Sequence, residues 1–183
     1  MKNLMTKTIQ LAQLNAPSTK LSVDNTNLLS EIDNLIEKSK LWFEENNIEI
    51  ENKISEDIIV KADKLRLAEI FDNLINNAVK YSPNGGPITI DAKQDKDFVI
   101  VTIKDMGMGM TEEQLGHLFE EFYKADLARH DFDSSGLGMS ICKRIVEKHG
   151  GEIWAESPGL GKGTTMFFTL PMSSGEQEEK KQQ

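Results

Sequence analysis

The chain has 183 residues, a length that favours one main domain with room for a short additional segment. Its formal net charge of −9 argues against nucleic acid as a partner, because holding a phosphate backbone requires a basic face. The single cysteine, Cys142, cannot form an intramolecular disulfide, and no apolar run reaches the roughly 18 residues of a membrane span. We therefore expect a cytoplasmic chain that does not itself insert into a membrane.

The N-terminal part of the sequence predicts a short helix followed by a linker. Residues 1–14 carry an apolar stripe that is too short to fold alone, so we expect the end of a longer helix here. Pro17 breaks this helix, and residues 17–27 are expected to form a linker. Asn27 or Ser30 can cap the next helix, which opens the main domain.

The main domain is expected to span residues 28–171, and the polar residues 172–183 are expected to be disordered. Its strands come in adjacent pairs rather than alternating with helices, which indicates an α+β fold with a mostly antiparallel sheet and helices packed against it. The predicted elements are a helix to about residue 45, strands 48–54 and 58–61, a helix capped by Asp63 and running to 81, strands 88–93 and 98–104, a short helix 111–119, a helix 136–149, and strands 152–156 and 164–170.

Two asparagines, Asn73 and Asn77, lie four residues apart on one face of the helix that ends at residue 81. Asparagine is a mediocre helix former, so this pair costs helix stability unless it has another use. The two carboxamide oxygens could help to hold a hydrated Mg2+, which prefers oxygen ligands. A solvated helix face near a turn explains the same pattern, and this segment alone does not separate the two interpretations.

Asp105 follows the strand 98–104 on the face of that strand's apolar residues, and Gly107 and Gly109 come directly after it. A carboxylate at the mouth of a core can accept a hydrogen bond from an exocyclic amine such as that of adenine. The glycines would let the backbone approach the base closely. Asp-x-Gly-x-Gly is also a common turn sequence, so the alternative is an ordinary turn.

Two further glycine-rich segments precede a helix and a strand. Ser135-Gly136-Leu137-Gly138 opens the helix expected at 136–149, where free backbone N–H groups can bind an anion. Ordinary helix capping is the alternative. Residues 159–165 precede the last strand, and a tight hairpin explains them equally well. The phosphate-binding loop Gly-x-x-x-x-Gly-Lys-Ser/Thr is absent.

Taken in order, these segments resemble the sequence boxes of the histidine kinase catalytic domain, which shares its fold with gyrase, the Hsp90 chaperones and MutL. The resemblance covers about residues 25–171 and implies a Bergerat-type ATP-binding fold: a two-layer α/β sandwich with a mixed, mostly antiparallel sheet and helices on one face. The matching boxes are Glu69-x-x-x-Asn73-Leu-x-x-Asn76-Asn77-Ala-x-Lys80-Tyr81-Ser82 (N), Asp105-Met-Gly107-Met-Gly109-Met (G1), Phe119-Glu-Glu-Phe122-Tyr-Lys124 (F), Ser135-Gly136-Leu137-Gly138-Met (G2) and the last glycine motif, Gly161-Lys-Gly163-Thr164.

The resemblance implies ATP and Mg2+ as ligands and a role for each residue of the phosphate side. Asn77, with Asn73 beside it, would coordinate the metal, and Lys80 and Tyr81 would face the phosphates and the nucleotide. Lys124 matches the position of a basic residue that contacts the terminal phosphate. Hydrolytic relatives resemble one another in having a glutamate at the position of Asn73, so the asparagine favours transfer to a protein group over hydrolysis.

On the base side, the resemblance implies that Asp105 accepts the adenine amine, with Thr164 supporting it through a water. Residues 126–134 would form a mobile lid over the nucleotide. Met106 replaces the usual asparagine of the G1 box, and Ser134 replaces a common first glycine of the G2 box. Both departures are expected to lower the affinity for nucleotide.

We therefore predict the catalytic domain of a two-component sensor histidine kinase, which donates the γ-phosphoryl group of ATP to a histidine on a dimerisation domain. None of the three histidines lies in the family's acceptor context, and residues 1–16 resemble the end of the second helix of that domain. We expect an excised fragment, or a product lacking the acceptor, that is monomeric and does not autophosphorylate. Its expected partners are the dimerisation domain and a response regulator, and a longer parent protein could be anchored in a membrane.

Two other functions remain open at this point. A regulatory nucleotide-binding module would switch contacts with a partner without transferring phosphate, and Met106 and the missing acceptor motivate this alternative. A serine kinase of the anti-sigma type would use the same fold on a serine-bearing partner.

Overall fold

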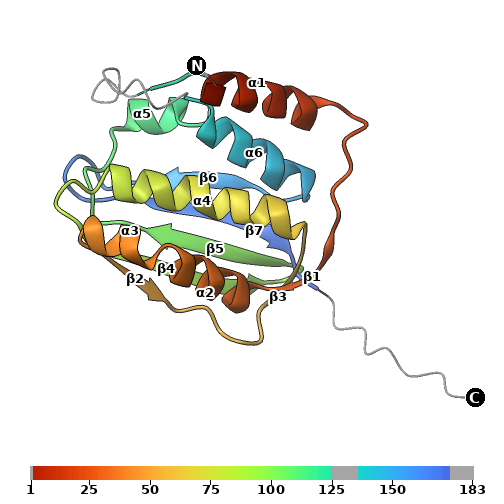
Figure 1. Ribbon diagram of the computed structural model, residues 1–183, viewed down its shortest axis with the longest axis horizontal. Helices are drawn as coiled ribbons and strands as arrows, with labels where there is room; N and C mark the ends of the chain where they lie inside the picture. The colour runs from red at the N-terminus through yellow and green to blue at the C-terminus, as the bar shows by residue number, and fades with distance from the viewer. Residues whose placement is uncertain (1, 125–135, 174–183) are drawn as a thin grey trace, which may run out of the picture.

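The computed structural model describes residues 2–124 and 136–173, which build one layer of helices over one face of a sheet (Figure 1). The predicted lid at 126–134, Ser134, Ser135 and nearly all of the predicted tail lie outside these described residues. The helices are α1 (Lys2–Asn15), α2 (Leu28–Lys38), α3 (Lys40–Glu45), α4 (Lys64–Lys80), α5 (Glu112–His117) and α6 (Gly138–Lys148). No helix in the described part of the chain is both long and apolar enough to cross a membrane.

The main sheet has the strand order β2-β4-β5-β7-β6, and a separate two-stranded sheet pairs β1 with β3. β2 runs parallel to β4, whereas every other neighbouring pair is antiparallel. The predicted α+β class with a mixed, mostly antiparallel sheet is thereby confirmed. The strands are β1 (Asp24–Asn27), β2 (Ile48–Asn52), β3 (Ile59–Ala62), β4 (Gly86–Asp95), β5 (Phe98–Lys104), β6 (Ile153–Glu156) and β7 (Thr165–Pro171).

Two local expectations were wrong. The segment expected to be a linker contains β1, whose four polar residues pair antiparallel with β3 from Asp24 opposite Ala62 to Asn27 opposite Ile59. The helix expected to run unbroken to residue 45 divides at Ser39, which ends α2 and begins α3. The short α3 then places Phe43 in the core.

The predicted caps are present where the side chains could supply them. Asn27 Oδ1 accepts a hydrogen bond from the backbone N–H of Ser30 at 2.9 Å, so Asn27 rather than Ser30 caps α2. Asp63 Oδ1 accepts from the N–H of Arg66 at 3.2 Å and caps α4. Such caps satisfy N–H groups that have no partner within the helix.

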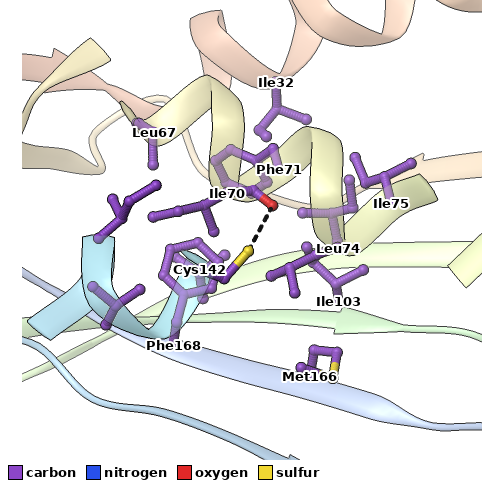
Figure 2. Packing of buried hydrophobic residues seen from close by; sticks show 14 of the residues in the cluster. Ile32, Leu67, Ile70, Phe71, Leu74, Ile75, Ile103, Cys142, Met166 and Phe168 are labelled. Atoms are coloured by element: carbon purple, nitrogen blue, oxygen red, sulfur yellow. Dashed lines mark hydrogen bonds between the residues drawn. The ribbon is translucent and has the colours of Figure 1, made fainter. Parts of the chain in front are cut away.

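The core lies between the sheet and the helices α4 and α6 (Figure 2). Phe71 of α4 meets Phe168 of β7 edge to face, with ring centroids 5.5 Å apart and an interplanar angle of 70°. The Sγ atom of the buried Cys142 lies 3.9 Å from the Ile70 carbonyl oxygen, which ties α6 to α4. Because these contacts fix α4 and α6 relative to each other, the polar face of α4 and the start of α6 have a defined relative position.

Candidate functional site

A cavity of about 580 Å3 opens beside α4, between the turn after β5 and the start of α6. Gly107 and Leu137, two of the predicted site residues, do not line it: both are buried, and Leu137 is fully so. Ser135 lies outside the described residues. The other predicted site residues all line the cavity, although the boxes that carry them are far apart in sequence: Asn73, Asn77, Lys80, Tyr81, Asp105, Gly109, Lys124, Gly136, Gly138 and Thr164.

At one end of the cavity, Asp105 is held by the backbone on both sides. Its Oδ1 atom accepts hydrogen bonds from the N–H of Gly107 at 2.8 Å and from the N–H of Thr164 at 3.2 Å. Its own N–H donates to the Thr164 carbonyl at 2.9 Å. Within the described residues, Oδ2 has no hydrogen-bond partner. This oxygen is therefore available to accept a hydrogen bond from a ligand in the cavity. We call this region, formed by Asp105, Thr164 and the turn 106–109, the base end.

Two glycines of the base end are required by close backbone contacts. A Cβ atom on Gly107 would lie 2.2 Å from the Tyr81 carbonyl oxygen, and one on Gly163 would lie 2.1 Å from the Asp105 carbonyl oxygen. Gly163 also has a φ of +73°, which other residues adopt only at a cost. The glycines allow three chain segments to meet at the carboxylate.

Burial raises the pKa of the Asp105 carboxyl above its ordinary value, and the hydrogen bonds from Gly107 and Thr164 partly oppose that shift. A carboxylate that loses hydration on burial binds strongly to a donor that replaces the lost water. The base end therefore favours a ligand that carries an N–H group.

The other end of the cavity is formed by α4, the start of α6 and the residues Tyr123 and Lys124. Asn73 Nδ2 donates to the Glu69 carbonyl at 3.0 Å, which fixes the side-chain amide. Its Oδ1 atom lies 3.1 Å from the position that a Cβ atom on Gly138 would occupy. The space beside this oxygen therefore exists because residue 138 has no side chain. We call this region the phosphate end.

Three lysines line the cavity: Lys7, Lys80 and Lys124. Asp105 is the only carboxylate among the described lining residues, and it lies at the base end. Lys80 Nζ lies 5.2 Å from the centroid of the Tyr81 ring, a cation–π contact at the cavity edge. In a chain with a net charge of −9, this concentration of positive charge favours an anionic ligand at the phosphate end.

Several lining residues were not predicted from the sequence. The cavity is also lined by Trp42 of α3, by Asn46 directly after α3, and by Lys7 of α1. No local pattern distinguishes these residues, because they come to the cavity only through tertiary packing. The other unpredicted lining residues are three polar ones, Asn76, Gln114 and Tyr123, and nine apolar ones: Met108, Met110, Met139, Met166, Leu74, Ala78, Val79, Leu118 and Leu160. Among these, the methionines that closely follow Asp105 in the sequence were the one available signal.

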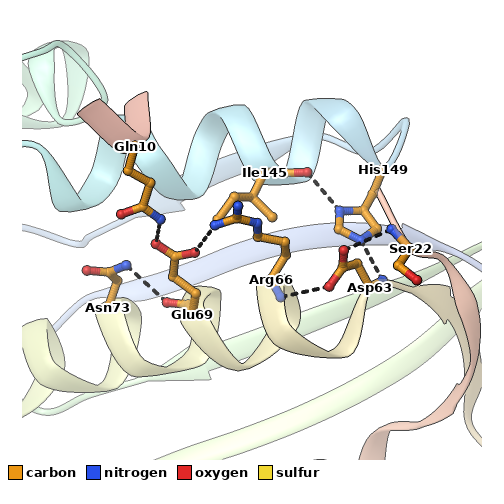
Figure 3. A network of polar contacts seen from close by, with 8 residues as sticks. All are labelled: Gln10, Ser22, Asp63, Arg66, Glu69, Asn73, Ile145 and His149. Carbon is orange, nitrogen blue, oxygen red and sulfur yellow. Dashed lines mark hydrogen bonds and ion pairs between the residues drawn. The ribbon is translucent and has the colours of Figure 1, made fainter. Parts of the chain in front are cut away.

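A polar network along α4 connects the phosphate end to α1 and to the far end of α6 (Figure 3). Glu69 accepts a hydrogen bond from Gln10 of α1 and pairs with Arg66 at 2.9 Å. At the other end, His149 Nδ1 lies 2.8 Å from the Ile145 carbonyl, so it carries the proton, and Nε2 accepts from the N–H of Asp63 at 3.0 Å. Burial lowers the pKa of His149, with the Ile145 carbonyl and the charge of Asp63 opposing that shift. His149 is thus a buried residue at the C-terminal end of α6.

Known proteins match the chain over the region that contains this cavity. Residues 62–174 match the family described as histidine kinase-, DNA gyrase B-, and HSP90-like ATPase. The sensor histidine kinase WalK of Bacillus subtilis (strain 168) is 31% identical over 182 residues, covering 98% of this chain and 30% of WalK. The adaptive-response sensory kinase SasA of Prochlorococcus marinus (strain AS9601) is 34% identical, covering 86% of this chain and 42% of SasA. The chain thus spans less than half the length of either relative.

Solved structures agree with the sequence comparison. Full-length ShkA in complex with AMPPNP superposes with a TM-score of 0.81 at 27% identity, covering 93% of this chain and 35% of ShkA. The nucleotide-free catalytic domain of the histidine kinase ThkA superposes with a TM-score of 0.73 at 27% identity, covering 82% of this chain and 96% of that domain. The chain belongs to the family of histidine kinase-, DNA gyrase B- and HSP90-like ATPases, and its relatives there are the catalytic domains of sensor histidine kinases.

Proposed function

We propose that this domain binds Mg-ATP in the cavity and donates the γ-phosphoryl group to a histidine on a dimerisation and phosphoacceptor domain. The observation that carries the proposal is the division of one cavity into two chemically different ends. A carboxylate with an available oxygen lies at the base end, and lysines with carboxamide oxygens lie at the phosphate end.

At the base end, Asp105 Oδ2 would accept a hydrogen bond from the adenine amine, and the methionines and leucines of the cavity would pack on the ring. The two backbone N–H groups that hold Oδ1 keep the carboxylate from turning away. Met106, which motivated the proposal of a regulatory module, is exposed and does not line the cavity. Its side chain therefore leaves room for the base.

At the phosphate end, Lys80 and Lys124 would bind phosphate oxygens, and backbone N–H groups at the start of α6 would add to this. Asn77 and Asn73 present carboxamide oxygens that suit Mg2+, and the space beside Asn73 fits a small ligand. When bound there, Mg2+ would neutralise charge on the phosphates during transfer. The chain's own residues contribute position and charge rather than covalent chemistry.

The residues around Asn73 favour transfer to a protein group over hydrolysis. An amide does not accept a proton from water usefully, and this one already donates to Glu69. The Glu69 carboxylate, one helical turn earlier, is occupied by Arg66 and Gln10. In the described part of the chain, no other carboxylate than Asp105 lines the cavity.

Its relatives support a proposal for the partner proteins of this domain. The matched kinases named above are sensors, and ThkA has been solved in complex with the response regulator protein TrrA, with a TM-score of 0.75 to this chain at 25% identity. We propose that the phosphoacceptor domain is the direct substrate and that a response regulator receives the phosphoryl group from it.

Calorimetric titration of Mg-ATP into the chain and into Asp105→Asn and Asn77→Ala variants tests the nucleotide site. Asp105→Asn places an amide donor opposite the adenine amine, so we expect its affinity to fall about 10- to 100-fold. Asp97→Asn is the matched control, because Asp97 is exposed just before β5 whereas Asp105 is buried just after it. Equal affinities for the Asp105 and Asp97 variants would refute the assigned base end.

Transfer is tested separately by adding a phosphoacceptor domain from a matched kinase and following label from [γ-32P]ATP onto its histidine. We expect labelling that depends on Mg2+ and on Asn77. Nucleotide binding without any labelling would refute donation of the phosphoryl group and favour the regulatory module.

A further inference from the structure

Lys7 lies on the face of α1 that packs against the rest of the domain. Along this helix, Leu11 and Leu14 follow Lys7 at i+4 and i+7, and Gln10 follows at i+3, so all four share one side. Leu11 and Leu14 are only 4% and 1% exposed, whereas Met5 is 64% exposed on another side of the helix. The face that carries Lys7 is therefore the docked one.

Two sets of hydrogen bonds attach this helix to the domain, one at its middle and one past its C-terminal end. Gln10 Nε2 donates a hydrogen bond to Glu69 Oε1 of α4, as Figure 3 shows. Past the end of α1, Lys148 Nζ of α6 donates to the carbonyls of Ala16 at 3.3 Å and Thr19 at 3.1 Å. α1 therefore lies alongside α6 with their C-terminal ends together, and the N-terminal half of α1 lies toward the start of α6 (Figure 1).

Lys7 is part of the wall of the cavity. Lys7 lines the cavity together with Asn73 and Gly138. Burial raises the pKa of the Cys142 thiol and the charge of Glu69 adds to that effect, while the charge of Lys7 and the side chain of Asn73 oppose it. Cys142 lies about one helical turn after Gly138 on α6, so the charge of Lys7 acts on the part of α6 that borders the cavity.

No carboxylate neutralises this lysine among the described residues. Lys7 is half-buried, and within residues 2–124 and 136–173 it makes no hydrogen bond or ion pair. Glu69, the α4 carboxylate that α1 contacts through Gln10, is also paired with Arg66. A half-buried ammonium without an anionic partner, in the wall of a cavity, attracts an anionic ligand.

We propose that Lys7 is a phosphate-binding residue of the nucleotide site, supplied by α1 from outside the segment that matches the family. The inference rests on the proposed function, because it requires a nucleoside polyphosphate in the cavity. It adds a cation that the predicted boxes do not contain. Since α1 carries this cation, nucleotide affinity depends on whether α1 is docked.

Titration of ATP, ADP and AMP with Mg2+ into the parent chain, Lys7→Gln and Lys7→Arg tests the proposal. Removing the charge should weaken ATP binding about three- to tenfold, the effect of losing one partly exposed charged contact. AMP binding should change by less than about twofold, because the lost contact is with the outer phosphates. Lys7→Arg keeps the charge and should stay close to the parent.

Lys20→Gln is the matched control, since Lys20 is exposed after α1 and its loss changes the net charge equally. It should leave all three affinities unchanged. Equal ATP affinity in the parent and Lys7→Gln, with Asp105→Asn still weakened, would overturn the role of Lys7 and leave the proposed function intact. An equal loss for ATP and AMP would also overturn it, because Lys7 would then act through the fold. A folded parent that binds no nucleotide would refute the proposed function itself.

Discussion

The two ends of the cavity are built in different ways. At the base end, Asp105 and Thr164 are each only 6% exposed, and backbone hydrogen bonds join the turn after β5 to the loop before β7. At the phosphate end, the contacts come from long side chains and amides on helix faces, such as Lys80 and Asn73. The base end is part of the folded core, whereas the phosphate end is a set of groups on its surface. Substitutions at the base end should therefore change stability and binding together, and those at the phosphate end should separate them.

The largest expected effect is that of Gly163→Ala at the base end. The new methyl would lie 2.1 Å from the Asp105 carbonyl oxygen, at a backbone φ of +73°. Since neither backbone segment can move without breaking the hydrogen bond from Asp105 N–H to the Thr164 carbonyl, we expect a loss of more than about 3 kcal/mol in the free energy of unfolding. Nucleotide binding should be lost at the same time. Urea unfolding and nucleotide titration measure the two effects.

Gly161→Ala measures the cost of the backbone strain in the absence of a clash. Gly161 has nearly the same φ, +75°, but a Cβ atom there would meet nothing within 4 Å. We expect a cost of about 1–2 kcal/mol from the left-handed conformation alone. If both variants lose the same stability, the loop yields to the new methyl and the base end is not rigid.

The next largest effect is expected at His149, which joins the far ends of the two helices that supply the phosphate end. His149→Gln removes a buried group that bridges the Ile145 carbonyl and the Asp63 N–H. We expect a loss of about 1–3 kcal/mol at neutral pH. Unfolding monitored by circular dichroism measures this loss, and His117→Gln, at an exposed histidine, is the control.

The pH dependence of stability should also change in the His149 variant. Burial lowers the folded-state pKa of His149, so the unfolded chain binds the proton more readily. The stabilisation by neutral His149 is complete above the unfolded pKa of about 6.5 and is lost as the pH falls through the lower folded value. Protonated Nε2 would face the Asp63 N–H, a second donor. The parent should therefore lose more stability than His149→Gln between about pH 7.5 and 5.5, and parallel curves would contradict the assigned role.

A smaller effect, on binding alone, is expected for Gly138→Ala at the phosphate end. The methyl would lie 3.1 Å from Asn73 Oδ1 and displace that oxygen, so we expect Mg-ATP affinity to fall about fivefold. Alanine is the better helix former, so stability should stay equal or rise by up to about 1 kcal/mol. Gly116→Ala, a helical position with no atom near the new methyl, is the control. A parallel loss of stability and affinity would mean that the phosphate end is as much a part of the core as the base end.

Whether a feature depends on neighbouring residues or on tertiary packing also explains whether it could be predicted from the sequence. Local patterns predicted the helix α4, the strands β4 and β5, and the caps Asn27 and Asp63, because each depends on neighbouring residues. The box residues around the cavity were found from the family resemblance, which describes the site as a whole.

Features that depend on tertiary pairing were missed. β1 is a strand only because β3 offers it backbone partners, since its four residues have no apolar alternation. Trp42 lies in the cavity wall because the chain divides into α2 and α3 at Ser39. Lys7 lies there because α1 packs beside α6. Neither the break at Ser39 nor the packing of α1 can be recognised from the local sequence.

The smallest expected effect tests whether α1 contributes to the phosphate end through its position. Gln10→Ala removes the hydrogen bond to Glu69, which keeps its ion pair with Arg66 at 2.9 Å. We expect less than about 1 kcal/mol of lost stability and about a twofold loss of ATP affinity, because Lys7 becomes less well placed. Gln13→Ala, at an exposed position of the same helix, should change neither. If Gln10→Ala weakens ATP binding more than Lys7→Gln does, then α1 acts on the site through Glu69 and α4 rather than through the charge of Lys7.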